Sequence, residues 1–249
     1  MTLLPAQPEQ PITLLQLSDS HLSQDPQAVY RGVHADANLA SLRPAIQDLG
    51  PDAIVLSGDI SEDASPASYW RMGGFVRDLA GKIAWIPGNH DEREVMAEIF
   101  DELGFDAGPI IEIGGWQVVL LDSARPNRPE GEADERRLAP VDAMDARRPA
   151  LVFVHHQPVA VGAPWIDKYP LIEPDRLWKK LAGKPVKAVA FGHVHQVFEG
   201  EHDGIACLSA PSTAANGRRD AEKFTPSEQG PSARWFRLWP SGRWETGIL

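Results

Sequence analysis

Five short apolar runs in this chain each end abruptly in a cluster of side chains that can bind metals or transfer protons. The runs lie at 12–17, 53–56, 82–86, 151–154 and 186–191. The clusters that follow them contain, in order, Asp19 and His21, Asp59, Asn89 and His90, His155 and His156, and His193 and His195. Apolar runs of this length are typical of buried strands. Open α/β sheets place their chemistry at the carboxyl ends of parallel strands. If these strands share one sheet, all five clusters meet at one edge.

The segments between the runs predict an α/β fold. Helical spacing is present at 35–49, 66–80, 92–103, 135–145 and 174–181, so strands and helices alternate as in βαβ units. A hairpin is expected at 109–121, and antiparallel strands from Val197 onward. We expect one domain over 1–249, with an N-terminal extension at 1–11. Residues 214–232 offer little apolar area, which predicts a flexible loop.

Composition limits the classes of partner. The net charge of −11 argues against nucleic acid and anionic membranes, because both require a basic face. A single cysteine, Cys207, excludes an intrachain disulfide framework. No apolar run approaches the ~20 residues of a membrane-spanning helix, and residues 1–10 lack the basic and apolar regions of a secretory signal. We therefore expect a cytoplasmic protein with a small-molecule partner.

The clustered residue types are those of a metal site without thiolate ligands. All eight histidines except His34 and His202 lie in the clusters, together with two aspartates and one asparagine. Such nitrogen and oxygen ligands suit Mn, Fe or Zn. A carboxylate such as Asp59 can bridge two ions, and two ions can activate a water and clamp a phosphoryl group. Two divalent ions would also offset the repulsion between an acidic protein and an anionic substrate.

The clusters in this order resemble the signature of the calcineurin-like metallophosphoesterases. The segments that carry the resemblance are Asp19-x-His21, Gly58-Asp59, Gly88-Asn89-His90-Asp91, His155-His156 and Gly192-His193-x-His195. Further stretches, including 15–22, 120–123 and 210–213, resemble the class III bacterial 3′,5′-cyclic-AMP phosphodiesterases. The resemblance covers about residues 12–249. It implies a four-layer α-β-β-α sandwich, in which two mixed sheets are flanked by helices.

The resemblance also implies a role for each residue of the signature. One metal ion would be held by Asp19, His21, Asp59 and His195, and a second by Asp59, Asn89, His155 and His193. His90 would contact phosphate and protonate the leaving oxygen, so that the catalytic residues are His90, Asp59 and Asn89. The substrate would contact His21, Asp59, Asn89, His90 and His195. Asp91 would support the turn without touching metal.

One ligand position remains open between His155 and His156. We choose His155 because it directly follows the strand, and His156 is expected to point to the other side. Trp165 is a candidate site-lining residue. Arg218, Arg219 and Lys223 are candidates for a phosphate contact, although a solvated charge cluster explains them as well.

The leading functional hypothesis is hydrolysis of 3′,5′-cyclic nucleotides, cAMP to 5′-AMP, by attack of metal-bound hydroxide on phosphorus with His90 as proton donor. The alternatives are a broader phosphodiesterase acting on glycerophosphodiesters or 2′,3′-cyclic nucleotides, and a non-catalytic scaffold of the same fold. The ligand types accept Fe, Mn or Zn alike. A homodimer is an expectation from the resemblance alone.

Overall fold

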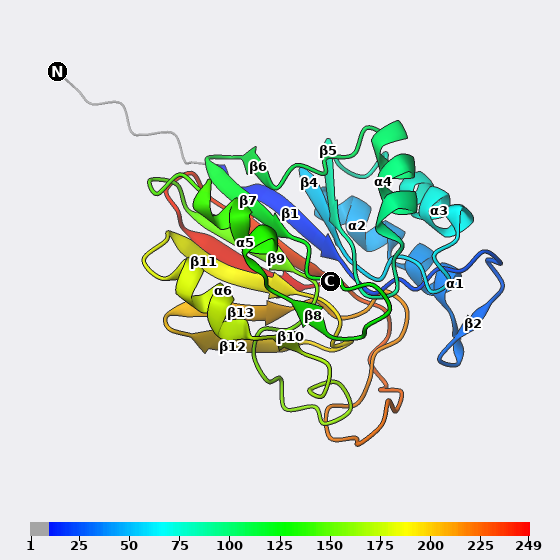
Figure 1. The fold of residues 1–249 in the computed structure, drawn as a ribbon. Coiled ribbons are helices and arrows are strands. Elements are labelled where there is room, and N and C mark those ends of the chain that lie inside the picture. Colours follow the sequence, from blue (N-terminus) through cyan, green and yellow to red (C-terminus); the bar gives the residue numbers. More distant parts are fainter. Residues whose placement is uncertain (1–9) are drawn as a thin grey trace.

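The computed structural model describes residues 10–249 and contains two large mixed β-sheets (Figure 1). The first sheet has the strand order β15-β14-β1-β4-β5. Its parallel strands are β1 (Ile12–Leu17), β4 (Ala53–Ser57) and β5 (Lys82–Ile86). Strands β14 (Arg234–Leu238) and β15 (Trp244–Ile248) complete it on the other side of β1, both in antiparallel pairing.

The second sheet has the strand order β12-β13-β11-β9-β7-β6. Its four central strands are parallel: β7 (Trp116–Leu121), β9 (Ala150–Val154), β11 (Val186–Phe191) and β13 (Ile205–Ser209). Antiparallel β6 (Ile110–Ile113) and β12 (Phe198–His202) form the two edges. Two-stranded pairs are formed by β2 (Val29–Tyr30) with β3 (Val33–His34), and by β8 (Gly131–Glu132) with β10 (Leu171–Ile172).

Three hydrophobic cores separate four layers. The first core packs β1, β4 and β5 against α1 (Ala35–Ser41), α2 (Arg43–Leu49), α3 (Pro66–Val76) and α4 (Arg93–Glu102). The second packs β7, β9 and β11 against α5 (Glu135–Asp142) and α6 (Pro174–Leu181). The third lies between the sheets and includes Phe153 of β9 in edge-to-face contact with Phe236 of β14, at 6.0 Å between ring centroids. The expected α-β-β-α sandwich is confirmed.

The structure corrects several sequence-based boundaries. The helix expected at 35–49 is divided at Leu42, because Pro44 cannot donate a backbone hydrogen bond and instead occupies the first turn of α2. The helices expected at 66–80 and 135–145 end earlier, at Val76 and Asp142. The C-terminal strands are not all antiparallel, since β13 pairs in parallel with β11. They also separate between the two sheets, which the alternation of residues did not indicate.

Two further expectations concern the N-terminal extension and the segment 214–232. Most of the N-terminal extension predicted at 1–11 lies outside the described residues. The segment 214–232 has no helix or named strand, yet its first residues, 214–216, are buried; its flexibility stays a prediction. Among residues 10–249, no helix has the length and apolar character required to cross a membrane.

Candidate metal centre

The polar clusters come together where the carboxyl ends of the two sheets face each other. The five strands do not share one sheet: β1, β4 and β5 belong to one sheet and β9 and β11 to the other, as the two-sheet sandwich implied by the resemblance requires. Hydrogen bonds nevertheless join the strand ends across the two sheets. The backbone N–H of His193 donates to the Asp19 carboxylate at 3.0 and 3.1 Å, and Nδ1 of His155 donates to the Ser57 carbonyl at 2.8 Å. The site is therefore assembled by sheet packing.

Three of the predicted metal ligands are histidines whose Nδ1 atom is already engaged. The acceptors are Glu62 Oε2 for His21 (2.8 Å), the Ser57 carbonyl for His155 (2.8 Å) and the Ala215 carbonyl for His195 (2.7 Å). Because a carbonyl or carboxylate oxygen can only accept, each Nδ1 carries the hydrogen. In the neutral ring, Nε2 is then left with a free lone pair. Such an arrangement is the usual way in which proteins orient histidine ligands of metals.

These Nε2 atoms converge on two buried carboxylates. Nε2 of His21 lies 3.1 Å from Nε2 of His195, which in turn lies 3.3 Å from Oδ1 of Asp19. Nε2 of His155 lies 3.3 Å from Oδ2 of Asp59, and Nε2 of His21 lies 3.7 Å from the same oxygen. Lone pairs at these distances repel one another unless a cation or a proton lies between them. The donors fit divalent metal ions that accept nitrogen and oxygen ligands.

A second group of donors consists of His155, His156 and His193, whose nearest nitrogens lie within 4.8 Å of one another. Nε2 of His193 donates to the Tyr169 carbonyl at 3.1 Å, which leaves Nδ1 as its free nitrogen. Oδ1 of Asn89 is buried and has no hydrogen-bond partner among the described residues. It is therefore available to a metal ion.

The expectation that His156 points away from the site is wrong. Strand β9 ends at Val154, so the alternation of side chains in a strand no longer applies to the two residues that follow. His156 is fully buried, and its Nδ1 lies 2.8 Å from the Ser123 hydroxyl. Its Nε2 has no hydrogen-bond partner among the described residues. Of His155 and His156, however, only His155 lies in contact with the Asp59 carboxylate.

The charges of the site follow from its burial and its close pairs. Burial favours the neutral form of Asp19, but the neighbouring His195 lowers its pKa to about 2. Burial and the charge of His155 lower the pKa of His193 to about 3. Burial also opposes protonation of His155, yet the Asp59 carboxylate raises its pKa to about 9. A metal ion bound by His155 must therefore displace a proton, which makes metal binding pH-dependent.

The backbone at five predicted site residues lies in the left-handed region. Their φ values are 55° at Asp19, 43° at His21, 50° at Asp59, 67° at His193 and 49° at His195. Residues other than glycine rarely adopt this conformation, which costs on the order of 1–3 kcal/mol at each position. The surrounding hydrogen bonds hold the strain in place, and strained backbone of this kind concentrates at functional sites.

Two glycines permit the close approach of the site's turns. A Cβ atom on Gly88 would collide with the side chain and backbone of Asp59, and one on Gly58 would collide with the His155 ring. Both glycines are therefore required by close contacts with the predicted ligands. Asp91 supports the same turns, as expected, because its carboxylate accepts hydrogen bonds from the backbone N–H groups of Gly88 (2.9 Å) and Ser61 (3.0 Å).

Glu62 is a site residue that the sequence analysis missed. Its Oε2 lies 2.8 Å from Nδ1 of His21 and 3.1 Å from Nδ1 of His90, so one carboxylate holds a predicted metal ligand and the predicted proton donor. Burial opposes the charged form of Glu62, but its hydrogen bonds to the two histidines lower its pKa to about 2. The same carboxylate raises the pKa of His90 to about 9 against the effect of burial. The one sequence feature that could have indicated Glu62 as a site residue is its position three residues after Asp59.

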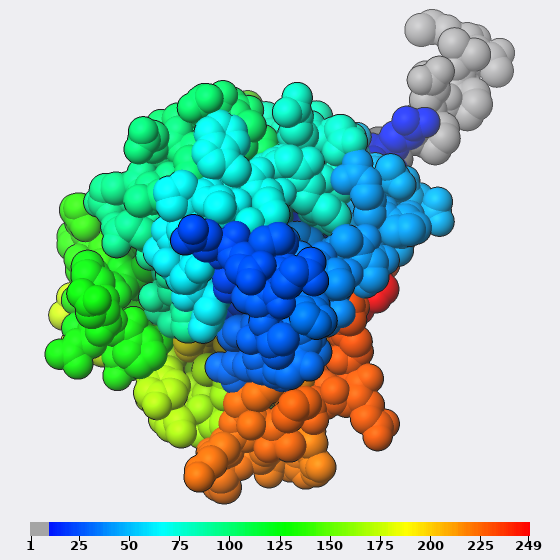
Figure 2. Space-filling model, turned by 90° about the vertical axis from the view of Figure 1, so that its right-hand side faces the viewer, coloured from blue at the N-terminus to red at the C-terminus, as the bar shows by residue number. Residues whose placement is uncertain are grey.

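Aromatic residues cover the side of the site formed by His21 and His195. Tyr30 stacks on His21 at 4.1 Å, and the Trp165 and Phe224 rings lie 6.2 and 6.1 Å from that of His195. Figure 2 views this end of the molecule, with the β2–β3 hairpin in blue above the segment 214–232 in orange. Trp165 thus packs beside the site without reaching the carboxylates. Arg218 pairs instead with Asp220, at 2.7 Å.

Comparisons with known proteins agree with this geometry. Residues 12–197 match the model of the calcineurin-like phosphoesterase family. The chain is 36% identical over 244 residues to the 3′,5′-cyclic adenosine monophosphate phosphodiesterase CpdA of Pseudomonas aeruginosa, with 95% of this chain and 89% of that protein covered. It is 30% identical to the protein of the same name from Escherichia coli, with 98% and 92% covered. The crystal structure of a dimetal phosphatase from Danio rerio has the same fold, with a TM-score of 0.67, 14% identity, and 96% and 99% of the two chains covered.

Because the converging donors repel one another without a cation, metal should stabilise the folded protein strongly. At a free metal concentration of about 100 times the Kd, binding adds about 2.7 kcal/mol, which corresponds to a rise in Tm of about 5–10 °C for a chain of this size. We expect this difference between Mn²⁺-loaded and chelator-treated protein in thermal melts. In Asp59→Asn, which changes a predicted ligand, most of this Tm difference should disappear. In Asp63→Asn, which changes a residue outside the predicted ligand set, the Tm difference should remain. An unchanged Tm after chelation would contradict the metal assignment.

Proposed function

The chain belongs to the calcineurin-like phosphoesterase family, and we propose that it hydrolyses 3′,5′-cyclic nucleotides, converting cAMP to 5′-AMP, at a centre of two metal ions. The observation that carries this proposal is the convergence of histidine Nε2 atoms on the buried Asp19 and Asp59 carboxylates. The substrate assignment is supported by the names of relatives that cover nearly the whole chain.

Each ion would be held by residues from both sheets. Asp19, His21, Asp59 and His195 would hold one, and Asp59, Asn89, His155 and His193 the other. The shared Asp59 contacts histidines of both sets, His21 and His155, which supports its bridging role. When bound, divalent ions supply Lewis acidity to a water molecule and to the phosphoryl oxygens. The nitrogen and oxygen ligands suit Fe, Mn or Zn.

Side chains around the phosphate would bind it and supply the proton for the leaving group. His21, Asp59, Asn89, His90 and His195 would surround it. Because Glu62 holds Nδ1 of His90 at 3.1 Å, the ring is oriented with Nε2 free to donate. The adjacent carboxylate stabilises the protonated ring. We propose that His90 gives its proton to the departing ribose oxygen, as general acids do for poor leaving groups.

The two alternative functions have less support. Every ligand position is filled by a residue that can bind metal, which disfavours a non-catalytic scaffold. A broader phosphodiesterase would use the same chemistry, but no described feature selects glycerophosphodiesters or 2′,3′-cyclic nucleotides. The cytoplasmic location and the homodimer stay predictions.

A turnover panel tests the proposed function. With Mn²⁺, the purified protein should convert 3′,5′-cAMP to 5′-AMP with a kcat/KM at least tenfold above those for 2′,3′-cAMP and glycerophosphocholine. Asp59→Ala, which removes the bridging ligand, should abolish turnover of all three. Turnover of 2′,3′-cAMP or glycerophosphocholine in preference to 3′,5′-cAMP would overturn the substrate assignment, and full activity after metal removal would overturn the mechanism.

Proton donation by His90 makes a separate prediction. His90→Gln should lower kcat for cAMP by about 10²–10⁴-fold, the usual contribution of a general acid. It should lower kcat much less for bis-p-nitrophenyl phosphate, because nitrophenolate departs without a proton. Glu98→Gln, an exposed change on α4, serves as the matched control. Equal losses on both substrates would show that His90 does not act as the proton donor.

A further inference from the structure

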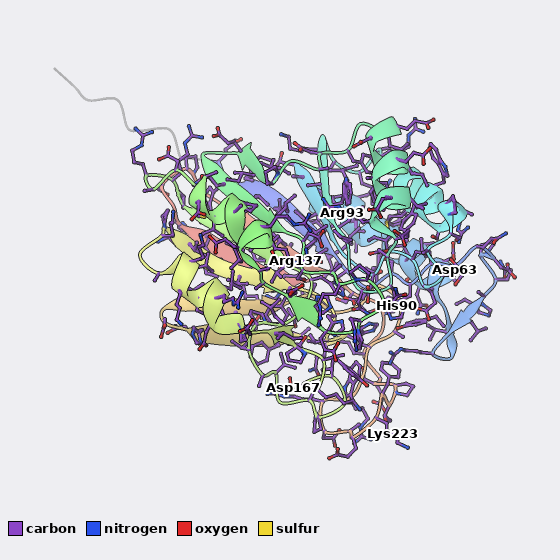
Figure 3. The ribbon with its side chains drawn as sticks, viewed as in Figure 1. Asp63, His90, Arg93, Arg137, Asp167 and Lys223 are labelled. Carbon is purple, nitrogen blue, oxygen red and sulfur yellow. The ribbon has the colours of Figure 1, made fainter. Side chains whose placement is uncertain are left out.

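A cavity of about 610 Å³ opens beside His90. Its walls come from both outer layers. Residues 88–92 lead into α4 on the first sheet, which adds Arg93 and Glu94, and residues 122–127 follow β7 and precede α5 on the second. Figure 3 shows Arg93 and Arg137, from helices on opposite layers, above His90 in that view. The cavity thus borders the predicted proton donor, and its lining does not include Tyr30, Trp165 or Phe224.

Arginine is the most frequent side chain in the lining of this cavity. The four arginines are Arg93, Arg125, Arg136 and Arg137. Arg93 pairs with Asp122, and Arg125 and Arg137 lie 3.7 and 4.0 Å from the Glu132 carboxylate. Arg136 is exposed and has no ion pair with any described residue. In a chain of net charge −11, four guanidinium groups around one cavity require an explanation.

Arg137 is the most constrained of the four. Its side chain is only 10% exposed, and one terminal nitrogen donates to the Ala124 carbonyl at 2.7 Å. Its Nε is buried and has no acceptor among the described residues. A buried N–H group without an acceptor is costly. The hydrogen bond to Ala124 and the limited exposure therefore hold the Arg137 guanidinium fixed in the wall of the cavity.

The acidic residues of the lining decide what kind of ligand fits. Asp91, Glu92, Glu94 and Asp122 also border the cavity and offset the formal charge of the arginines. The cavity is therefore poorly suited to a second phosphate. It offers flat guanidinium faces and N–H donors, which stack on planar rings and bind their acceptor atoms. Asp122 and Asn127 add acceptor oxygens for an exocyclic amino group.

We propose that this cavity is the nucleoside pocket, and that Arg136 and Arg137 bind the purine ring and ribose of the substrate. The inference rests on the proposed function. If His90 protonates the leaving oxygen, the group attached to that oxygen must occupy the space beside His90. In a 3′,5′-cyclic nucleotide that group is the ribose, and the base extends from it. The cavity provides this space directly next to the ring that donates the proton.

The aromatic cluster near His195 is a less suitable position for the base. The guanidinium of Arg31 already lies 3.8 Å above the centre of the Phe224 ring and 5.6 Å from that of Trp165. A base could stack there only if the Arg31 side chain moved off these rings. The arginine-lined cavity requires no such movement.

Equilibrium binding of 5′-AMP and inorganic phosphate to the Mn²⁺-loaded protein, measured by calorimetry, tests the proposal without turnover. Arg137→Lys keeps the charge but removes the planar donor, and Arg136→Gln is an exposed change that should leave folding intact. Each should raise the Kd for AMP about tenfold, the typical loss of one charge-assisted hydrogen bond. The Kd for phosphate should change less than twofold. Arg128→Gln, in the loop between β7 and α5 and outside the lining of the cavity, should alter neither.

Two results would contradict the assignment of this cavity as the nucleoside pocket. If the cavity variants weakened the binding of AMP and of phosphate equally, the arginines would contact the phosphate and not the nucleoside. If Arg31→Ala weakened the binding of AMP and the cavity variants did not, the base would bind at the aromatic cluster. Failure of the proposed function has a different signature. The protein would then not hydrolyse cAMP, while the selective loss of AMP binding in the cavity variants would remain measurable.

Discussion

The structure depends on burying two carboxylates, Asp19 and Asp59, among histidines whose free nitrogens point at them. Such a cluster is unfavourable by itself, since desolvated charges and facing lone pairs raise the free energy of the folded chain. The architecture nevertheless fixes it in place. Buried hydrogen bonds cross from one sheet to the other, from His155 to Ser57 and from His193 to Asp19, and the side-chain amide of Gln16 donates to the Phe191 carbonyl. Left-handed backbone at the ligands adds further strain. Cations in the cluster would convert these unfavourable contacts into coordination.

The residue types of the site could be predicted from the sequence, but the way in which the two sheets bring them together could not. Their positions just after apolar strands made Asp19, Asp59 and His193 candidate ligands, because a strand end and a residue type are both local features of a sequence. The division of the strands between two sheets is a long-range property, and spacing along the chain does not encode it. Strand alternation gave the wrong direction for His156, since the strand ends before the pair. Glu62 was missed because its role depends on two histidines that are distant in sequence and adjacent only after folding.

The site has a buried part and a partly exposed part, and they have different proposed roles. The two carboxylates and their histidines form an almost closed interior, whereas His90 and Glu62 are partly exposed at its border. The Glu62 carboxylate contacts both His21, a proposed metal ligand, and His90, so the position of the proposed proton donor is tied to the proposed metal centre. The arginine-lined cavity begins where His90 faces outward. Family membership accounts for the interior. The arginines of the cavity are where a preference among substrates would arise.

The most direct test of this account is a crystal structure of Mn²⁺-loaded protein with anomalous diffraction recorded on both sides of the manganese absorption edge. The account predicts two anomalous peaks, both in contact with the Asp59 carboxylate. One would be bound by Asp19, His21 and His195, and the other by Asn89, His155 and His193. A single peak, or peaks that do not touch Asp59, would contradict the bridged centre on which the proposed chemistry depends.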